Sequence, residues 1–326
     1  MVVSPVNLRD SPGVPSDPLS DALALANARL VVTGGFTIGG AWALVAWPQA
    51  RLKLTAVVRG TCWVLTDAPE PPFRLAEGDV AVLNDRRRVV LASDPTAADP
   101  VDPSDLFGPG RAPIVRLTDT EDTLVIGGHV DLNQAGEDLL LTALPPVTAV
   151  RSGTAPAPML RWLLDRLQHE LTSDEPGGEL AVRQYSQLLL LEVLRAHLGN
   201  TDAFPAGWMR ALADDRLAPA LRLMHADPAR AWQLPELARA AAMSRTTFAE
   251  RFRTVAGMPP LTYLHRWRMR LAERALREDD TPIATLAPTL GYTSESAFSN
   301  AFKRTVGVAP RRYRDAARQL NVQTRP

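Results

Sequence analysis

Residues 291–314 read GYTSESAFSNAFKRTVGVAPRRYR, and residues 242–264 read AMSRTTFAERFRTVAGMPPLTYL. The two stretches carry one pattern of aromatic, glycine and proline residues at a fixed offset of 50 positions. The residues that repeat are Phe248, Phe252, Gly257, Pro260 and Tyr263, matched by Phe298, Phe302, Gly307, Pro310 and Tyr313. The offset indicates that one small structural unit occurs twice near the end of this chain.

Each copy predicts a short helix, a tight turn and a second helix. In the first copy, PELARAAA has a proline in the first helical turn, and Ser244 is suited to cap the helix that follows. In the second copy, Pro282 and Ser294 take the same two positions. The paired phenylalanines of each second helix are four residues apart and so share one buried face. The pattern predicts helix-turn-helix units at about 235–255 and 282–305, whose second helices can enter the major groove of DNA.

The outward faces of the two second helices carry the candidate DNA contacts. Asn300 is predicted to bond adenine, and Arg253 and Lys303 to contact phosphates. The full set of predicted DNA-binding residues is Arg245, Thr246, Ala249, Glu250, Arg253, Glu295, Ser296, Ser299, Asn300, Lys303 and Arg304. Between the copies, LTYLHRWRMRLAERALRED predicts a helix of about 19 residues, roughly 28 Å long. Because successive major grooves on one side of DNA lie roughly 34 Å apart, we expect the two units to bind adjacent segments of double-stranded DNA.

The charge is divided unevenly along a chain that is neutral overall. Residues 201–326 hold 20 Arg and Lys against 12 Asp and Glu, whereas residues 1–200 hold 16 against 24. A basic C-terminal part favours a polyanion as its partner. Aromatic pairs at this spacing are in most helices only core, but two copies, surplus arginine and a spacing helix together favour DNA binding.

The rest of the chain predicts four regions. Residues 1–16 have the composition of a disordered leader, and residues 17–150 alternate short apolar runs with turn residues, which is typical of a β-barrel or sandwich. Within them, the Pro- and Asp-rich segment 93–113 is predicted to be a long mobile loop. Residues 151–204 hold two leucine-rich helices, which either pack on the β-domain or form a homodimer interface. The DNA-binding domain occupies 205–326.

Two further observations bear on location. No apolar run is long enough to span a membrane, so no membrane partner is expected. The single cysteine, Cys62, rules out an internal disulfide and fits a reducing compartment. We expect a cytoplasmic protein.

Residues 220–319 resemble the DNA-binding domain of the AraC/XylS family of bacterial transcription regulators. The residues that carry the resemblance are Ala287, Gly291, Tyr292, Ser294, Phe298, Phe302, Lys303, Gly307, Pro310, Tyr313 and Arg314. The N-terminal part is similar to the cupin-type sensor domain of one branch of that family, in the stretches WALVAW (42–47), VVRGTCWV (57–64), LAEGDVAVL (75–83) and ALPPV (143–147). The resemblance implies an α+β two-domain protein with a cupin-like β-barrel, a helical linker and an all-α domain carrying two helix-turn-helix units. It also implies action at promoters, as an activator or a repressor, with RNA polymerase as a further candidate partner.

The β-region offers a candidate ligand pocket and no candidate metal site. Trp42, Trp47 and Trp63 are the predicted ligand contacts, although aromatic side chains in a barrel serve equally as core. Of the five histidines only His129 lies in this region, so we expect no metal, no cofactor and no enzymatic activity. Two functions stay open: a regulator controlled by a small effector in the barrel, or an effector-independent dimeric DNA-binding protein whose barrel is only structural.

Overall fold

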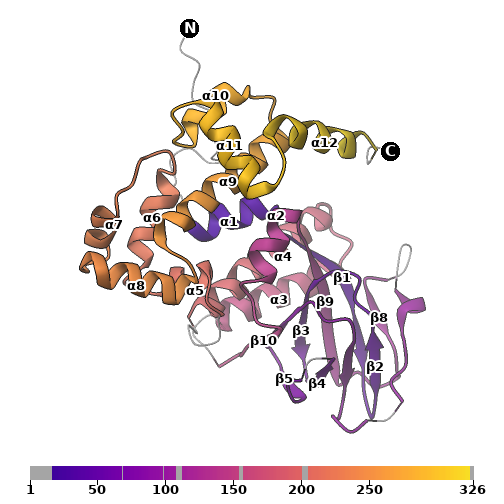
Figure 1. The fold of residues 1–326 in the computed structure, drawn as a ribbon. Helices are drawn as coiled ribbons and strands as arrows, with labels where there is room; N and C mark the ends of the chain where they lie inside the picture. Colours follow the sequence, from indigo (N-terminus) through magenta and orange to yellow (C-terminus); the bar gives the residue numbers. More distant parts are fainter. Residues whose placement is uncertain are drawn as a thin grey trace. The chain divides into compact units, whose positions relative to one another are not determined.

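The computed structural model describes residues 17–67, 69–97, 99–107, 112–153, 157–199 and 205–323. The expected disordered leader, residues 1–16, lies outside the described residues. The chain divides into two compact units, drawn in Figure 1. One unit extends from Ala26 to Pro205, and the other combines the segment up to Leu25 with the segment from Ala206 onward.

Two β-sheets with facing inner surfaces form the first unit. The larger sheet has the strand order β10-β6-β3-β9-β1-β8, and the smaller has the order β2-β7-β4-β5. The strands are β1 (Arg29–Ile38), β2 (Ala43–Ala46), β3 (Leu52–Arg59), β4 (Thr61–Thr66), β5 (Phe73–Ala76), β6 (Val80–Asn84), β7 (Val89–Ala92), β8 (Ile114–Arg116), β9 (Thr123–Asp131) and β10 (Val147–Val150). β1 and β8 pair in parallel, and the other pairs are antiparallel. The expected cupin-like β-domain is confirmed.

The core of this unit lies between the two sheets. Val57 of β3 and Val64 of β4 belong to one buried cluster with Phe36 of β1. Side chains of a strand alternate between its two faces. Cys62 and Val64 are therefore fully buried, while Trp63 between them is only half-buried and points to the opposite face of the smaller sheet.

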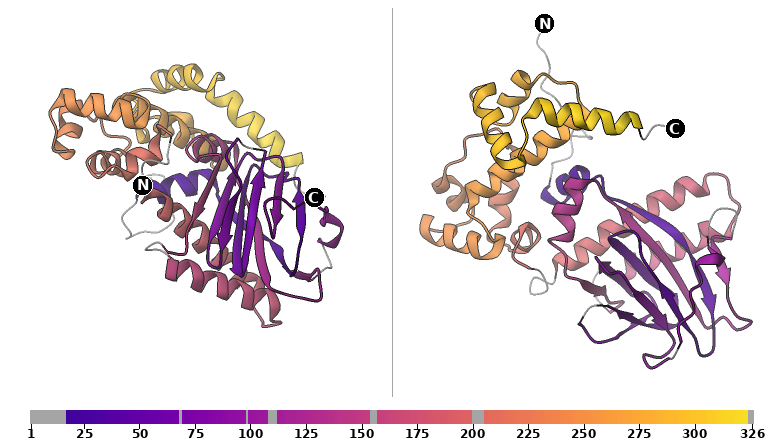
Figure 2. Two further views of the ribbon diagram at one scale, coloured as in Figure 1. Left: turned by 90° about the horizontal axis from the view of Figure 1, so that it is seen from below. Right: turned by 45° about the vertical axis from the view of Figure 1, so that its right-hand side comes forward.

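A helical hairpin covers the larger sheet. It consists of α3 (Ala157–Thr172) and α4 (Gly178–Leu198), and α4 packs on β1 and β10. The Gln187 amide donates to the carbonyl of Ala28 at 2.9 Å, and His197 Nε2 lies 2.6 Å from Thr148 Oγ1. Figure 2 shows both helices beside the strands. The leucine-rich helices thus bury one face against the β-domain. Leu163 is fully buried in this packing.

Part of the expected long loop has regular structure. Val101 continues the smaller sheet: its carbonyl accepts from Val45 N at 2.9 Å, and its N–H donates to the Ala43 carbonyl at 3.0 Å. One turn of helix, η1 (Ser104–Leu106), follows. Two further short helical segments, α2 (Gln134–Gly136) and η2 (Glu137–Leu141), come between β9 and β10.

The second unit is all-helical in its described residues. Its helices are α1 (Pro18–Ala26, whose last residue falls in the first unit), α5 (Trp208–Ala213), α6 (Ala218–Ala226), α7 (Leu234–Ala240), α8 (Arg245–Ala256), α9 (Pro260–Glu278), α10 (Ile283–Thr289), α11 (Glu295–Val306) and α12 (Pro310–Gln323). The 19-residue α9 packs against α8, α11 and α12. The expected all-α domain with two helix-turn-helix units, α7–α8 and α10–α11, is confirmed.

Helix α1 attaches to this unit through a buried histidine. Asp21 Oδ2 lies 3.2 Å from His225 Nδ1, and the Tyr263 hydroxyl lies 2.8 Å from His225 Nε2. A carboxylate can only accept, so Nδ1 carries the proton and Nε2 accepts from Tyr263. The imidazole also stacks on Trp267, with ring centroids 4.0 Å apart. Burial is the main cause that lowers the pKa of His225, so the ring is neutral at pH 7.

Candidate functional site

The two helix-turn-helix units have the same serine cap, and the turn of the second unit is one residue longer than that of the first. Ser244 Oγ accepts from Thr247 N at 3.2 Å, and Ser294 Oγ accepts from Ala297 N at 3.1 Å. Each turn passes through the left-handed region, at Ala242 (φ 50°) and at Gly291 (φ 78°). A cap of this kind fixes where the second helix begins, and so which of its residues face outward.

An aromatic trio holds each second helix in place. The rings of Phe248 and Phe252 are 5.7 Å apart, and Phe252 meets Tyr263 of α9 at 5.7 Å. The second trio repeats this geometry: Phe298 and Phe302 are 5.7 Å apart, and Phe302 meets Tyr313 of α12 at 5.5 Å. All four phenylalanines are fully buried. The repeat in the sequence is therefore a repeat of core packing.

Most of the predicted DNA-binding residues lie on the exposed part of their helices. Ala249, Glu295 and Ser299 are half-buried, and the remaining eight are exposed. Among the residues that the structure describes, Arg253 and Lys303 have no ion-pair partner. Glu295 instead lies 3.6 Å from Arg311 of α12, so its carboxylate is partly neutralised within the unit. Figure 1 shows α8 and α11 as separate helices on the same unit.

Several basic residues of this unit form ion pairs or hydrogen bonds with other residues of the same unit. Arg251 pairs with Asp214 at 2.6 Å, and the Arg268 guanidinium donates to the carbonyls of Pro228 and Arg230. The sequence did not distinguish these arginines from Arg253, because their partners lie 37 to 40 residues away along the chain. Arg312, exposed in the first turn of α12, was not among the predicted residues, although it lies only two residues after the helix-starting Pro310.

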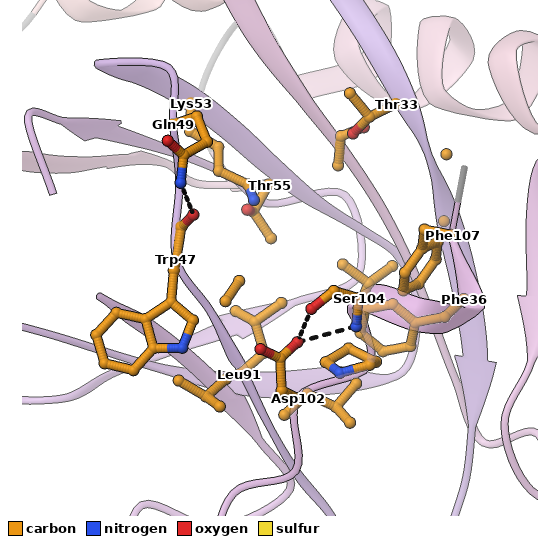
Figure 3. A pocket seen from close by; sticks show the side chains of 18 residues that line it. Thr33, Phe36, Trp47, Gln49, Lys53, Thr55, Leu91, Asp102, Ser104 and Phe107 are labelled. Atoms are coloured by element: carbon orange, nitrogen blue, oxygen red, sulfur yellow. Dashed lines mark hydrogen bonds between the residues drawn. The ribbon is translucent and has the colours of Figure 1, made fainter. Parts of the chain in front are cut away.

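The first unit contains a pocket between its sheets. The cavity has a volume of about 510 Å³. Side chains from β1, β2, β3, β7 and the 102–107 segment form its walls, as Figure 3 shows. Its apolar lining includes Phe36, Leu44, Trp47, Leu91 and Phe107, and its polar lining includes Thr33, Gln49, Lys53, Thr55, Asp102 and Ser104.

The three predicted tryptophan contacts occupy different places. Trp47 lines this pocket and is half exposed. Trp42 is buried and lines a neighbouring cavity of about 520 Å³ near Leu106 and Leu117. Trp63 lines neither cavity, because its place on β4 turns its side chain away from the space between the sheets.

Two chemistries find little support in this unit. Burial raises the pKa of the Cys62 thiol to about 12, so the reactive thiolate is scarce at pH 7. Among the described residues, no group of three or more His, Cys, Asp or Glu side chains is arranged to hold a metal ion. No helix in the described part of the chain is long and apolar enough to cross a membrane.

Comparison with known proteins agrees with this geometry. The cupin family model matches residues 17–199, and a helix-turn-helix domain model matches residues 237–316. A protein of Streptomyces antibioticus named as an AraC-like transcription regulator is 41% identical over 298 residues, which cover 91% of this chain and 98% of its own. A protein of the same name from Streptomyces lividans is 40% identical with the same coverage.

A solved structure is also similar to part of the chain. The DNA-binding domain of AdpA, in complex with a target DNA, is 33% identical over 34% of this chain and 99% of its own, with a TM-score of 0.32. The duplicated helix-turn-helix, the cupin domain and the named relatives define a DNA-binding transcription regulator, which is not an enzyme. The chain belongs to the AraC family of transcription regulators.

Proposed function

We propose that this regulator binds promoter DNA with α8 and α11 in successive major grooves, under the control of a small effector held in the barrel pocket. The observation that carries the first half is the duplicated aromatic trio, which presents two equivalent helices from one unit. The 19 residues of α9 span roughly 28 Å, close to the spacing of roughly 34 Å between major grooves.

The base-reading role is assigned to Asn300 and a phosphate-binding role to Lys303. Both side chains are exposed on α11, and Arg253 takes the position of Lys303 on α8. An asparagine that bonds adenine through two hydrogen bonds discriminates by about 1–3 kcal/mol, whereas a phosphate contact carries no sequence information. The remaining predicted contacts, Arg245, Thr246, Ala249, Glu250, Ser296, Ser299 and Arg304, are proposed to line the same surface, with Glu295 at its edge.

Binding-site selection from random DNA tests these roles. Asn300→Ala should relax the base preference at one or two positions, and Lys303→Ala should weaken all sites alike. Lys303→Ala should also reduce the slope of log affinity against log salt by about 0.9. Arg74→Ala, which removes an exposed charge on β5, serves as the control and should leave the base preference and the salt slope unchanged. An unchanged base preference in Asn300→Ala would refute its reading role.

The cavity of about 510 Å³ favours effector control over a purely structural barrel, because ligand pockets typically measure roughly 300–1,000 Å³. Trp47 is the proposed ligand contact among the three tryptophans. To act, the effector must bind the DNA-competent and DNA-incompetent states with different affinities. A variant whose pocket is filled by a larger side chain should therefore lose the response to the ligand and keep its basal DNA binding. A DNA-binding assay of this variant, with and without ligand, measures both.

We also propose that the helical hairpin forms a homodimer interface. Met159, Trp162, Leu180 and Leu188 remain exposed on its outer side, each by 46–55%. Leu188→Asp should yield a folded monomer in sedimentation velocity, whereas Leu163→Asp should unfold the domain because Leu163 is buried. A wild-type protein that is monomeric at micromolar concentration would refute the dimer.

The regulator is proposed to act in the cytoplasm and to contact RNA polymerase when it activates transcription.

A further inference from the structure

A lysine lies inside the barrel pocket. Lys53 of β3 shares the inward face with Thr55 and Val57, and it is half-buried. Figure 3 draws Lys53 and Thr55 across the pocket from Phe36 and Phe107. Two of the 36 basic residues of the chain are lysines, and one of them occupies this position. A cation at an inward strand position is unusual, because such positions normally hold apolar core.

The nearby carboxylates bond groups other than Lys53. Asp102, on the pocket wall, accepts hydrogen bonds from the backbone N–H of Ser104 at 2.9 Å and from its hydroxyl. The hydroxyl of Ser104 is the main cause that lowers the pKa of Asp102. On β9, His129 pairs across from Lys53 and lies 3.1 Å from Asp131. In the described part of the chain, Lys53 forms no ion pair and no side-chain hydrogen bond.

An unpaired ammonium in this place is unfavourable. Removing it from water without a partner disfavours the charged form, and burial is what lowers the pKa of Lys53. A bound carboxylate would supply the missing opposite charge and reverse this shift. A ligand with one negative group would therefore give the Lys53 ammonium the ion-pair partner that it has in no other described residue.

The remainder of the pocket is suited to an apolar body. Phe36, Leu91 and Phe107 contribute aromatic and aliphatic walls. Gly127 of β9 adds open space, since a Cβ there would meet only the Leu54 carbonyl oxygen, at 4.0 Å. A ligand that satisfies both parts carries one anionic group and an apolar portion.

We propose that the barrel pocket binds a small organic acid, with its carboxylate on the Lys53 ammonium and its apolar body against Phe36, Leu91 and Phe107. This inference rests on the proposed role of the pocket as the effector site, and it names the chemical class of the effector.

Matched probes test the charge requirement. We would measure binding of decanoate and decanamide, and of 2-naphthoate and 2-naphthamide, to the full-length protein by calorimetry at pH 7. Within each pair the shape is nearly constant and only the charge differs. Each acid should bind at least about 10-fold more tightly than its amide, as expected for a charged hydrogen bond in a pocket. The pair whose acid binds more tightly shows whether the pocket prefers an aliphatic or an aromatic apolar body.

Two variants locate the effect. Lys53→Met keeps the length of the side chain and removes the charge, so it should abolish the difference between acid and amide. Gly127→Leu should fill the cavity and abolish binding of all four probes, without a backbone clash. Lys303→Ala removes the chain's other lysine, which lies on the DNA-binding unit, and should leave probe binding unchanged. Circular dichroism confirms that each variant is folded.

The titration of Lys53 gives an independent readout. In protein labelled with ¹³C-lysine, Lys303→Arg leaves a single lysine whose Cε signal reports its ionisation. A saturating acid should raise the pKa of Lys53, and the amide should not.

Each other outcome overturns the inference. If acid and amide bind equally to the wild type, the effector role of the pocket survives and its preference for acids fails. If Lys53→Met retains the preference, Lys53 is not the anion partner. If none of the four probes binds, both the inference and the assignment of this cavity as the effector site fail.

Discussion

The two helix-turn-helix units have the same core but different supports. In both, a pair of phenylalanines and a tyrosine fix the recognition helix, with ring distances that agree within 0.2 Å. The first tyrosine, Tyr263, bonds the buried His225, whereas the second, Tyr313, accepts from Arg277 Nη1 at 2.7 Å in a half-exposed setting. A repeated sequence pattern therefore reflects shared core packing, while the hydrogen bonds around each core can differ.

The largest expected effect tests whether the two cores are equivalent. Phe252→Ala and Phe302→Ala each remove a fully buried ring, so each should lower the free energy of unfolding of the helical unit by about 3–5 kcal/mol. Urea denaturation of the full-length protein, followed by tryptophan fluorescence, measures the loss. A loss below about 1 kcal/mol at either position would break the equivalence.

The two turns should respond to different extents when their left-handed residues are exchanged. Gly291 has φ 78°, and a Cβ there would meet the Ala229 carbonyl oxygen at 2.3 Å, so Gly291→Ala should destabilise by about 1–3 kcal/mol. Ala242 already carries a Cβ at φ 50°, so Ala242→Gly should change stability by less than about 1 kcal/mol. Thermal unfolding of the two variants provides the measurement. Equal losses would mean that the turns are not distinguished by backbone contact.

The tyrosines should differ in the same way as their partners. Tyr263→Phe leaves His225 Nε2 buried without its donor and should cost about 1–3 kcal/mol. Tyr313→Phe leaves Arg277 beside a half-exposed site, where water can replace the hydroxyl, so it should cost less than about 1 kcal/mol. Similar losses in urea denaturation would show that the two supports are equally strong.

Two histidines of the helical unit, His225 and His265, should affect the pH dependence of its stability to different extents. The pKa of His225 is lowered mainly by burial, so its neutral form stabilises the fold above the unfolded pKa of roughly 6.5. That contribution is lost as the pH falls from there through the folded pKa, with a slope of at most about 1.4 kcal/mol per pH unit.

A matched variant isolates this slope. His225→Gln should flatten the decline in unfolding free energy between pH 7 and pH 5. The pKa of His265 is also lowered, first by burial and then by Arg304, but its ring is only half-buried, so His265→Gln should flatten the decline less. A larger effect from His265 would show that the depth of burial does not set the size of the pH effect.

Local spacing made the helix-turn-helix units predictable. Phenylalanines four residues apart, serine caps and glycines after the second helices act within one or two turns of chain, and the structure places them as their periodicity requires. The strand character of residues 29–150 was equally visible, because alternation of apolar residues is also local.

Contacts between distant residues were not predictable. The ion pair of Arg251 with Asp214 and the attachment of α1 to His225 depend on how the chain returns on itself, which periodicity does not encode. Lys53 stands between two leucines and would have been assigned to the solvent side of a strand, yet both faces of β3 are covered. Trp63 failed to line a cavity for a related reason, since the sequence shows alternation but not which face is inward.

The attachment of α1 to the helical unit has a consequence for the order of synthesis. Residues 26–205, which fold as the other unit, are translated between α1 and the rest of its own unit. At 5–20 residues per second, a ribosome needs roughly 9–36 s to make those 180 residues. During that interval the nascent α1 has no His225 to bind, so the DNA-binding unit can be completed only after the barrel has left the ribosome.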